Sequence, residues 1–233
     1  MVRIPIGVAE IDEYLAGEEP PPPIATSIAD VSTGQAVARI GKKTRGLVLL
    51  EARPSLRRLI AGGIDDRTLA YVGRATGLEH LSVLGSRITN LRPLATLHRL
   101  RLFDVNVSSR LRTLDGIEGL SSLEYLAMSN CSGALDVAAV ARLRRMKVIF
   151  LSGFMHTPMR IDSLAPLSDL TDLRVLQLQA VRVRDRSLAP LHGLIKLHRL
   201  DLPRFFPARE IDALADALPS AQGNWRRWVT RKG

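Results

Sequence analysis

The sequence predicts an α/β solenoid, in which a parallel β-sheet forms the concave face and short helical or 3-10 return segments form the convex face. Two observations predict it. The chain of 233 residues is 46% hydrophobic but only 4% aromatic, and 37 of its residues are leucine. In addition, one spacing of apolar residues recurs at intervals of 19 to 27 residues from residue 78 onward. A period of this length, filled by one branched aliphatic residue, is typical of stacked repeats.

Residues 1–25 form the first predicted element, an acidic segment with a proline linker. The first 30 residues carry one arginine and six acids, a net charge of −5, so the rest of the chain carries +15. Val8, Ile11 and Leu15 have helical spacing, and the four prolines at 20–23 favour an extended tether. We expect either a loosely ordered tail or a short docking helix on a stiff linker.

Residues 26–77 predict an N-terminal cap followed by a degenerate first repeat. Residues 36–40 and 47–50 are apolar runs on either side of Gly41-Lys42-Lys43, which predicts a β-hairpin. Further on, the apolar residues at 56, 59 and 61 predict a strand, and residues 64–72 its return segment. Acidic residues favour the first turn of a helix, so we expect a helix to begin at Asp65-Asp66.

Residues 78–218 contain the repeats. Each has an apolar residue, two variable residues, an apolar residue, one variable residue and a third apolar residue. The pattern occurs at Leu78-Leu81-Val83, Leu97-Leu100-Leu102, Leu123-Leu126-Met128, Met146-Ile149-Leu151, Leu173-Leu176-Leu178 and Leu197-Leu200-Leu202. Residues 91–94, 164–167 and 188–191 each read Leu-x-Pro-Leu, a spacing that suits a short 3-10 return. Neither strand nor return can bury its apolar side alone, so the repeats must stack.

These repeats resemble a leucine-rich repeat protein over about residues 56–218, and the Leu-x-Pro-Leu returns are similar to the internalin and SDS22-like subclass. The convex turn of that family usually carries asparagine at one position of each repeat. Here that position holds other residues, so we expect an irregular convex turn: Ser86, Val105, Cys131, Phe154, Val181 and Phe205.

Residues 219–233 predict a C-terminal cap and a basic tail. They follow a predicted helix that begins at Pro207, places Ile211, Leu214 and Leu218 on one side, and ends at Pro219.

The composition argues against an enzyme, a metal protein and a membrane protein. A single cysteine, Cys131, excludes a disulfide scaffold and a multi-cysteine metal site, and its repeat position predicts a buried thiol. The five histidines lie in different repeats without metal-ligand spacing. We therefore expect no catalytic residues, no metal and no cofactor. No apolar run has the length of a signal peptide or a membrane span, so we expect a cytoplasmic protein without a membrane partner.

Side chains that alternate along the strands predict a protein-binding surface on the concave face. An apolar strip, consisting of Leu84, Phe103, Tyr125, Val148, Phe150 and Val175, is flanked by arginines, and aromatic residues framed by arginine are typical of interaction hot spots. The predicted binding residues are Arg58, His80, Leu84, Arg99, Arg101, Phe103, Tyr125, Val148, Phe150 and Arg199. The sequence leaves the identity of the partner open. The alternatives are another subunit of a larger assembly, a toxin that this chain neutralises as an immunity protein, and the chain's own acidic N-terminal segment.

Nucleic-acid binding is the alternative, because the net charge is +10 and the tail is rich in tryptophan and arginine. Its candidate residues are Trp225, Arg226, Arg227, Trp228, Arg231 and Lys232. However, Glu79, Asp104, Glu124 and Asp201 lie among the basic residues of the concave strands and would repel phosphate, so we favour a protein partner.

Overall fold

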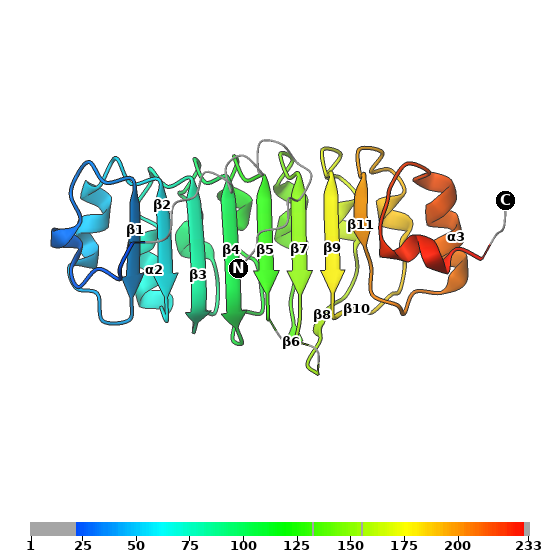
Figure 1. Cartoon of the computed structure of the whole chain (residues 1–233), viewed down its shortest axis with the longest axis horizontal. Coiled ribbons are helices and arrows are strands. Elements are labelled where there is room, and N and C mark those ends of the chain that lie inside the picture. The colour runs from blue at the N-terminus through cyan, green and yellow to red at the C-terminus, as the bar shows by residue number, and fades with distance from the viewer. Residues whose placement is uncertain (1–21, 132, 155, 231–233) are drawn as a thin grey trace.

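The computed structural model describes residues 22–131, 133–154 and 156–230, which form an elongated solenoid (Figure 1). Eight parallel strands make the main sheet in the order β1-β2-β3-β4-β5-β7-β9-β11. Their bounds are β1 (Val37–Gly41), β2 (Arg58–Gly62), β3 (His80–Ser86), β4 (Leu102–Ser108), β5 (Tyr125–Ser129), β7 (Val148–Ser152), β9 (Val175–Gln179) and β11 (Arg199–Asp201). The predicted parallel solenoid is therefore confirmed.

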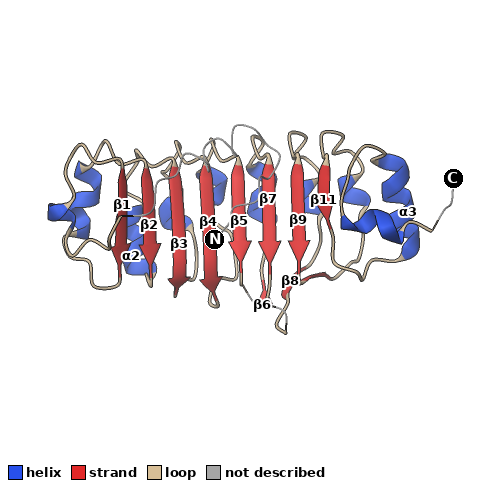
Figure 2. Ribbon diagram, in the orientation of Figure 1, coloured by secondary structure: helices blue, strands red, loops and turns tan. Residues whose placement is uncertain are grey.

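Short helical segments return the chain from one strand to the next and lie behind the sheet in Figure 2. They are α2 (Asp66–Val72), η3 (Arg92–Leu94), η4 (Ile117–Gly119), η5 (Ala138–Arg142), η6 (Ala165–Leu167) and η7 (Ala189–Leu191), and α3 (Ala208–Ala217) follows the last strand. The three Leu-x-Pro-Leu segments form η3, η6 and η7 as predicted, with proline in the first turn, where its missing N–H costs no hydrogen bond.

The core is a set of aliphatic columns between the sheet and the returns. In the repeat that contains β3, Leu78, Leu81 and Val83 are fully buried, and the equivalent residues of the other repeats continue the same columns. Burial of one such side chain stabilises the fold by about 1.5–3 kcal/mol relative to exposure. Stacking therefore provides each repeat with a core that it lacks alone.

The N-terminal hairpin prediction is wrong. Strand β1 pairs in parallel with β2, so it is the first strand of the solenoid. Residues Leu47–Ala52 form a 3-10 helix, η2, after Gly46 turns the chain with a φ of 67°. In this helix Leu50 is buried whereas Val48 and Leu49 are exposed, a pattern that follows a helical rather than an alternating period.

The predicted helix start at Asp65 is confirmed, because this residue caps α2. Its carboxylate accepts a hydrogen bond from the backbone N–H of Thr68 at 2.9 Å and another from the Thr68 hydroxyl at 2.9 Å. These bonds favour the charged form and lower the pKa of Asp65.

A second, three-stranded parallel sheet lies beyond the carboxyl ends of the main strands (Figure 1). It contains β6 (Gly133–Ala134), β8 (Met159–Ile161) and β10 (Val181–Val183), in the order β10-β8-β6. The turns that lead towards it include left-handed residues, among them Asn130 at φ 54° and Ala180 at φ 48°. The predicted irregular turns are therefore present here, as left-handed residues that lead towards a small second sheet.

Helix α3 and the following 3-10 helix η8 (Asn224–Trp228) close the C-terminal end of the solenoid. Ile211, Leu214 and Leu218 are buried, as their spacing predicts. At the other end η1 (Ile28–Asp30) packs near η2. The predicted N-terminal helix and the first two of the four prolines that follow it fall within residues 1–21, outside the described residues.

Candidate protein-binding surface

The strand register defines the concave face, which we take as the side chains that point away from the return segments. Its first row is Arg58, His80, Leu102, Tyr125, Val148, Val175 and Arg199. Its second row is Ile60, Ser82, Asp104, Ala127, Phe150, Gln177 and Asp201. Leu84, Asn106, Ser129, Ser152 and Gln179 follow in a third row.

The predicted position of Phe103 is wrong. Register pairs Leu81 with Phe103, so this ring lies in the core column and is fully buried. Leucines spaced by three continue from the return segment into the strand, so the pattern that begins at Leu97 also fits the repeat. In the structure the repeat of this strand begins at Leu100. Burial of this large ring in the core is more favourable in free energy than its exposure on the concave face.

Arg99 and Arg101 are displaced by the same shift of register. The backbone N–H of Arg101 donates to Glu79 O, and the N–H of Glu124 donates to Arg101 O, so Arg101 lies before strand β4 with these two acids beside it. Arg99 lies two residues further out and is exposed. Both therefore lie at the amino edge of the sheet rather than on its concave rows.

The apolar strip is smaller than predicted. Leu84, Tyr125 and Phe150 are half-buried and accessible, whereas Val148 and Val175 are only 2% and 1% exposed. These two valines face the concave side, but short side chains among longer neighbours on a concave surface lose contact with solvent. We call Leu84, Tyr125 and Phe150 the central strip.

A buried polar cluster surrounds His80, which is 3% exposed. Its Nε2 lies 3.2 Å from Asp104 Oδ2 and 3.1 Å from Ser82 Oγ, and the Ser82 hydroxyl donates to the same Asp104 oxygen. These are the residue types of a hydrolase triad. In a triad, however, the two ring nitrogens serve the acid and the nucleophile separately. Here one nitrogen contacts both, so the imidazole does not bridge the aspartate and the serine through separate nitrogens as it does in a triad.

Charges alternate along the amino edge of the sheet, in an ion-pair row made of Arg57, Glu79, Arg101, Glu124 and Lys147. Arg57 Nε lies 3.3 Å from Glu79 Oε1, and Arg101 Nη2 lies 2.8 Å from Glu124 Oε2. Lys147 Nζ is 3.6 Å from the other oxygen of Glu124. The row is largely self-neutralised, which would weaken its attraction for phosphate.

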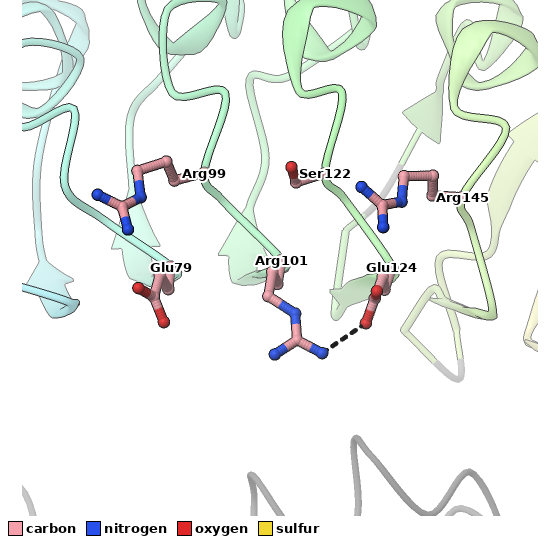
Figure 3. Close-up of a pocket in the computed structure, with 6 residues that line it drawn as sticks. All are labelled: Glu79, Arg99, Arg101, Ser122, Glu124 and Arg145. Carbon is pink, nitrogen blue, oxygen red and sulfur yellow. Dashed lines mark hydrogen bonds and ion pairs between the residues drawn. The ribbon is translucent and has the colours of Figure 1, made fainter.

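A shallow pocket of about 270 Å³ opens over this row (Figure 3). Arg99, Ser122 and Arg145 line one side, and Glu79, Arg101 and Glu124 line the other. The Arg99 and Arg145 side chains extend towards the two glutamates without a salt bridge within 4.0 Å. This edge of the sheet therefore offers charges of both signs to a polar partner.

Arg58 and Arg199 are the remaining predicted residues, and each lies close to neighbouring side chains. Arg58 is 8% exposed. Arg199 Nε lies 3.6 Å from Asp201 Oδ2, and the other oxygen of Asp201 accepts the backbone N–H of Asn224. Arg199 therefore borders the surface at its C-terminal end as part of the cap.

The described candidates for nucleic-acid binding in the C-terminal tail, Trp225 to Trp228, pack into the end of the solenoid. Trp225 is fully buried, and the Arg226 guanidinium lies 4.5 Å from its ring centre. Arg226 also donates to the carbonyls of Leu218, Pro219 and Ala221, which belong to the C-cap of α3 and the turn that follows it. Arg227 lies 5.8 Å from the half-buried Trp228 ring. Arg231 and Lys232 fall outside the described residues.

The single cysteine of the chain, Cys131, is buried and free. Burial raises the pKa of the Cys131 thiol, so it is protonated and unreactive near neutral pH. Among the described residues no group of three or more histidine, cysteine, aspartate or glutamate side chains is placed to hold a metal. In the same residues, no helix combines the length and apolar character needed to cross a membrane.

Leu102 and Asp104 are the residues of β4 that occupy the two concave rows, and of these only Asp104 is expected there from the sequence. The signal was present, because adjacent strands pair with offsets of 21, 22, 22, 23, 23, 27 and 24 residues. A repeat that begins at Leu100 keeps that even spacing, whereas one that begins at Leu97 gives intervals of 19 and 26. Evenness of period would have placed Phe103 in the core.

No protein-family model and no curated protein match the sequence. Solved structures do share the fold. Internalin C2 from Listeria monocytogenes matches with a TM-score of 0.54 and 20% identity over 66% of this chain and 64% of its own, which is less than two thirds of its length. The internalin inlF from the same organism gives a TM-score of 0.53, with 15% identity over 84% of this chain and 72% of its own.

A third structure comes from a plant. The leucine-rich repeat ectodomain of the Arabidopsis thaliana receptor kinase GASSHO1/SCHENGEN3, in complex with CASPARIAN STRIP INTEGRITY FACTOR 2, has a TM-score of 0.52 and 18% identity over 71% of this chain and 20% of its own. Likeness at these identities concerns the fold alone. The chain has the leucine-rich repeat fold, of the kind seen in internalins.

Proposed function

We propose that this leucine-rich repeat solenoid is a non-enzymatic interaction module whose concave face binds another protein. The central strip is the observation that carries the proposal. Its two rings, Tyr125 and Phe150, stay accessible on adjacent strands of a rigid sheet, although large apolar side chains are normally withdrawn from water. Rigid aromatic anchors of this kind dominate the energy of protein interfaces.

The surroundings of the strip suit a protein partner better than a nucleic acid. The ion-pair row alternates in sign along the amino edge, and Asp104 and Asp201 add negative charge to the concave rows. A partner can match such a pattern with charges of both signs, which adds specificity rather than bulk affinity. A phosphate backbone, which carries one sign of charge, cannot.

The dimensions also fit. Eight strands at about 4.8 Å spacing span about 34 Å, comparable to one side of a standard interface. One structural neighbour, the plant receptor ectodomain, was solved in complex with CASPARIAN STRIP INTEGRITY FACTOR 2, which is compatible with ligand binding by this fold. A cytoplasmic location and a place in a larger assembly or a toxin–immunity pair belong to the same proposal.

Capture from native cells tests it with three forms of the full-length protein: the natural sequence, a Tyr125→Ser/Phe150→Ser double variant, and an Ile195→Ser control. Ile195 is apolar and 80% exposed but lies off the concave rows, on the segment after η7. We expect the natural sequence and the control to retain the same partner, and the double variant to lose it by at least about tenfold.

Thermal unfolding of the double variant should stay within a few degrees of the natural protein, because both rings are partly exposed. Undiminished capture by a folded double variant would show that the central strip is not the binding site.

A further inference from the structure

The second sheet places like charges side by side, which is the starting point for a separate site. Arg160 on β8 and Arg182 on β10 are direct partners in register. The residues that flank them, Met159, Ile161 and Val181, are buried, so alternation directs both arginines outward. Strands lie about 4.8 Å apart, and like charges opposite one another destabilise a sheet.

A groove of about 610 Å³ runs over these strands, and its volume lies within the range of ligand sites. Arg160, Arg182, Arg184, Arg186, Asp162 and Phe205 line it. Four arginines, from β8, β10 and the residues after β10, thus lie around one groove.

The groove has an excess of positive charge. Arg184 Nε lies 3.3 Å from Asp162 Oδ1, but both side chains are about four-fifths exposed, so water screens this pair. Among the described residues no carboxylate lies within 4.0 Å of the guanidinium of Arg160, Arg182 or Arg186. The ion-pair row of the main sheet, in contrast, matches its cations with acids. The groove therefore retains about three uncompensated positive charges.

An aromatic surface lies at one end of the groove. Phe205 stacks on Phe206 with ring centres 4.5 Å apart, and the Arg186 guanidinium lies 6.0 Å from the Phe205 ring centre. The cations that line the groove lie on β8, on β10 and in the residues that follow β10.

We propose that this groove binds single-stranded nucleic acid. The arginine track would contact successive phosphates, since the guanidinium fork matches phosphate oxygens, and a base would stack on the Phe205 and Arg186 end. A line of cations that ends in a planar surface fits a strand of phosphates and bases better than it fits an acidic peptide, which has no base to stack. The site is separate from the central strip, so it stands whether or not the concave face binds a protein.

The test uses fluorescence anisotropy of a labelled single-stranded DNA of about 12 nucleotides, titrated with the full-length protein between about 50 and 200 mM salt. The Arg160→Ala/Arg182→Ala variant removes two groove charges. The Arg45→Ala/Arg67→Ala control removes two exposed charges at the N-terminal end of the solenoid.

We expect the groove variant to bind about tenfold more weakly and to reduce the magnitude of the slope of log K against log salt by about 1.4, the value for two lost phosphate contacts on a single strand. The control should change both quantities much less. Equal losses in the two variants would mean that binding follows net charge alone, which overturns the proposal.

Two further arms address the chemistry of the ligand. Phe205→Leu should weaken binding severalfold without altering the salt slope, because it removes stacking and no charge; Phe205→Tyr keeps the ring and should restore affinity. A labelled poly-glutamate peptide of equal length should bind much more weakly. If it binds as tightly as the DNA and loses affinity in the groove variant, the groove takes acidic peptides and the nucleic-acid proposal is wrong.

Discussion

At the scale of single residues, Phe103 and Phe150 show how one position along a strand decides a role. Their strands lie in the same sheet, yet Phe103 is fully buried in the core and Phe150 lies half-buried on the concave face. A shift of one residue in register exchanges these two environments, since successive side chains of a strand point to opposite faces.

This difference gives a stability prediction. Phe103→Ala should lower the free energy of unfolding by about 3–5 kcal/mol, because it leaves a cavity in the core. Phe150→Ala should cost about 1 kcal/mol, since its ring is already partly in water. Urea unfolding followed by circular dichroism measures both. Similar losses for the two variants would contradict the register described above.

His80 shows that residue types alone do not define chemistry. Serine, histidine and aspartate come within hydrogen-bonding distance in its cluster, but one ring nitrogen contacts both partners. The sequence separates these residues by 22 positions, from Ser82 to Asp104, so only the stacking of two strands brings them together.

At the scale of elements, the solenoid depends on close contact between successive return segments. Gly73, which ends helix α2, is buried against η3. A β-carbon there would lie 1.9 Å from the carbonyl oxygen of Pro93, a distance that no side chain tolerates. The glycine is therefore required by packing between repeats rather than by its own backbone angles.

We expect Gly73→Ala to lower the free energy of unfolding by about 1–3 kcal/mol, as overpacked sites do. Gly193→Ala is the matched control, because nothing lies within 4 Å of its added β-carbon, and it should change stability by no more than about 0.5 kcal/mol. Urea denaturation of both variants measures the difference. A Gly73 variant as stable as the control would mean that α2 and η3 are not held at this distance.

The two sheets use arginine in opposite ways, which is also a property of elements. Along the main sheet, Arg57, Arg101 and Lys147 alternate with glutamates one strand away. On the small sheet, Arg160 faces Arg182 instead of an acid. The cations of the ion-pair row therefore have acids beside them, whereas the paired arginines of the small sheet have each other.

At the scale of the whole molecule, a solenoid has two open ends that must be covered. Trp225 covers the C-terminal end: it is fully buried, and Gly223 before it approaches the carbonyl of Leu200 so closely that a β-carbon would overlap it. Arg226 donates to the carbonyls of Leu218 and Pro219, just after the end of α3. The basic tail thus belongs to the fold.

Trp225→Ala should therefore destabilise the C-terminal end first. Each repeat contacts only its neighbours, so hydrogen exchange should quicken most in β11 and α3 and least in β1 and β2. Trp228→Ala, which removes a half-buried ring from the same helix, should have a smaller effect. Uniformly faster exchange along all eight strands would show that the solenoid unfolds as a single unit and would contradict this account.

How far the sequence led differs between the fold and the site. The period of leucines, the Leu-x-Pro-Leu returns, the cap at Asp65 and the C-terminal helix are local patterns, and each is confirmed. The N-terminal hairpin was wrong because residues 47–50 have apolar side chains that suit a strand or a helix equally. The site was half predicted: Tyr125, Phe150 and Leu84 are accessible on the concave face, whereas Phe103, Val148 and Val175 are not.

The sequence by itself determined the architecture of this protein, because stacked repeats bury the same columns of leucine in every unit and the period is written in the chain. Only the tertiary structure decided which side chains share a surface. The register between strands is set by how side chains pack in the core. The leucine pattern alone does not reveal this register, because the repeat of β4 can be started at Leu97 or at Leu100. For that physical reason the accessible rings, the ion-pair row and the arginine groove emerged only when the strands were placed side by side.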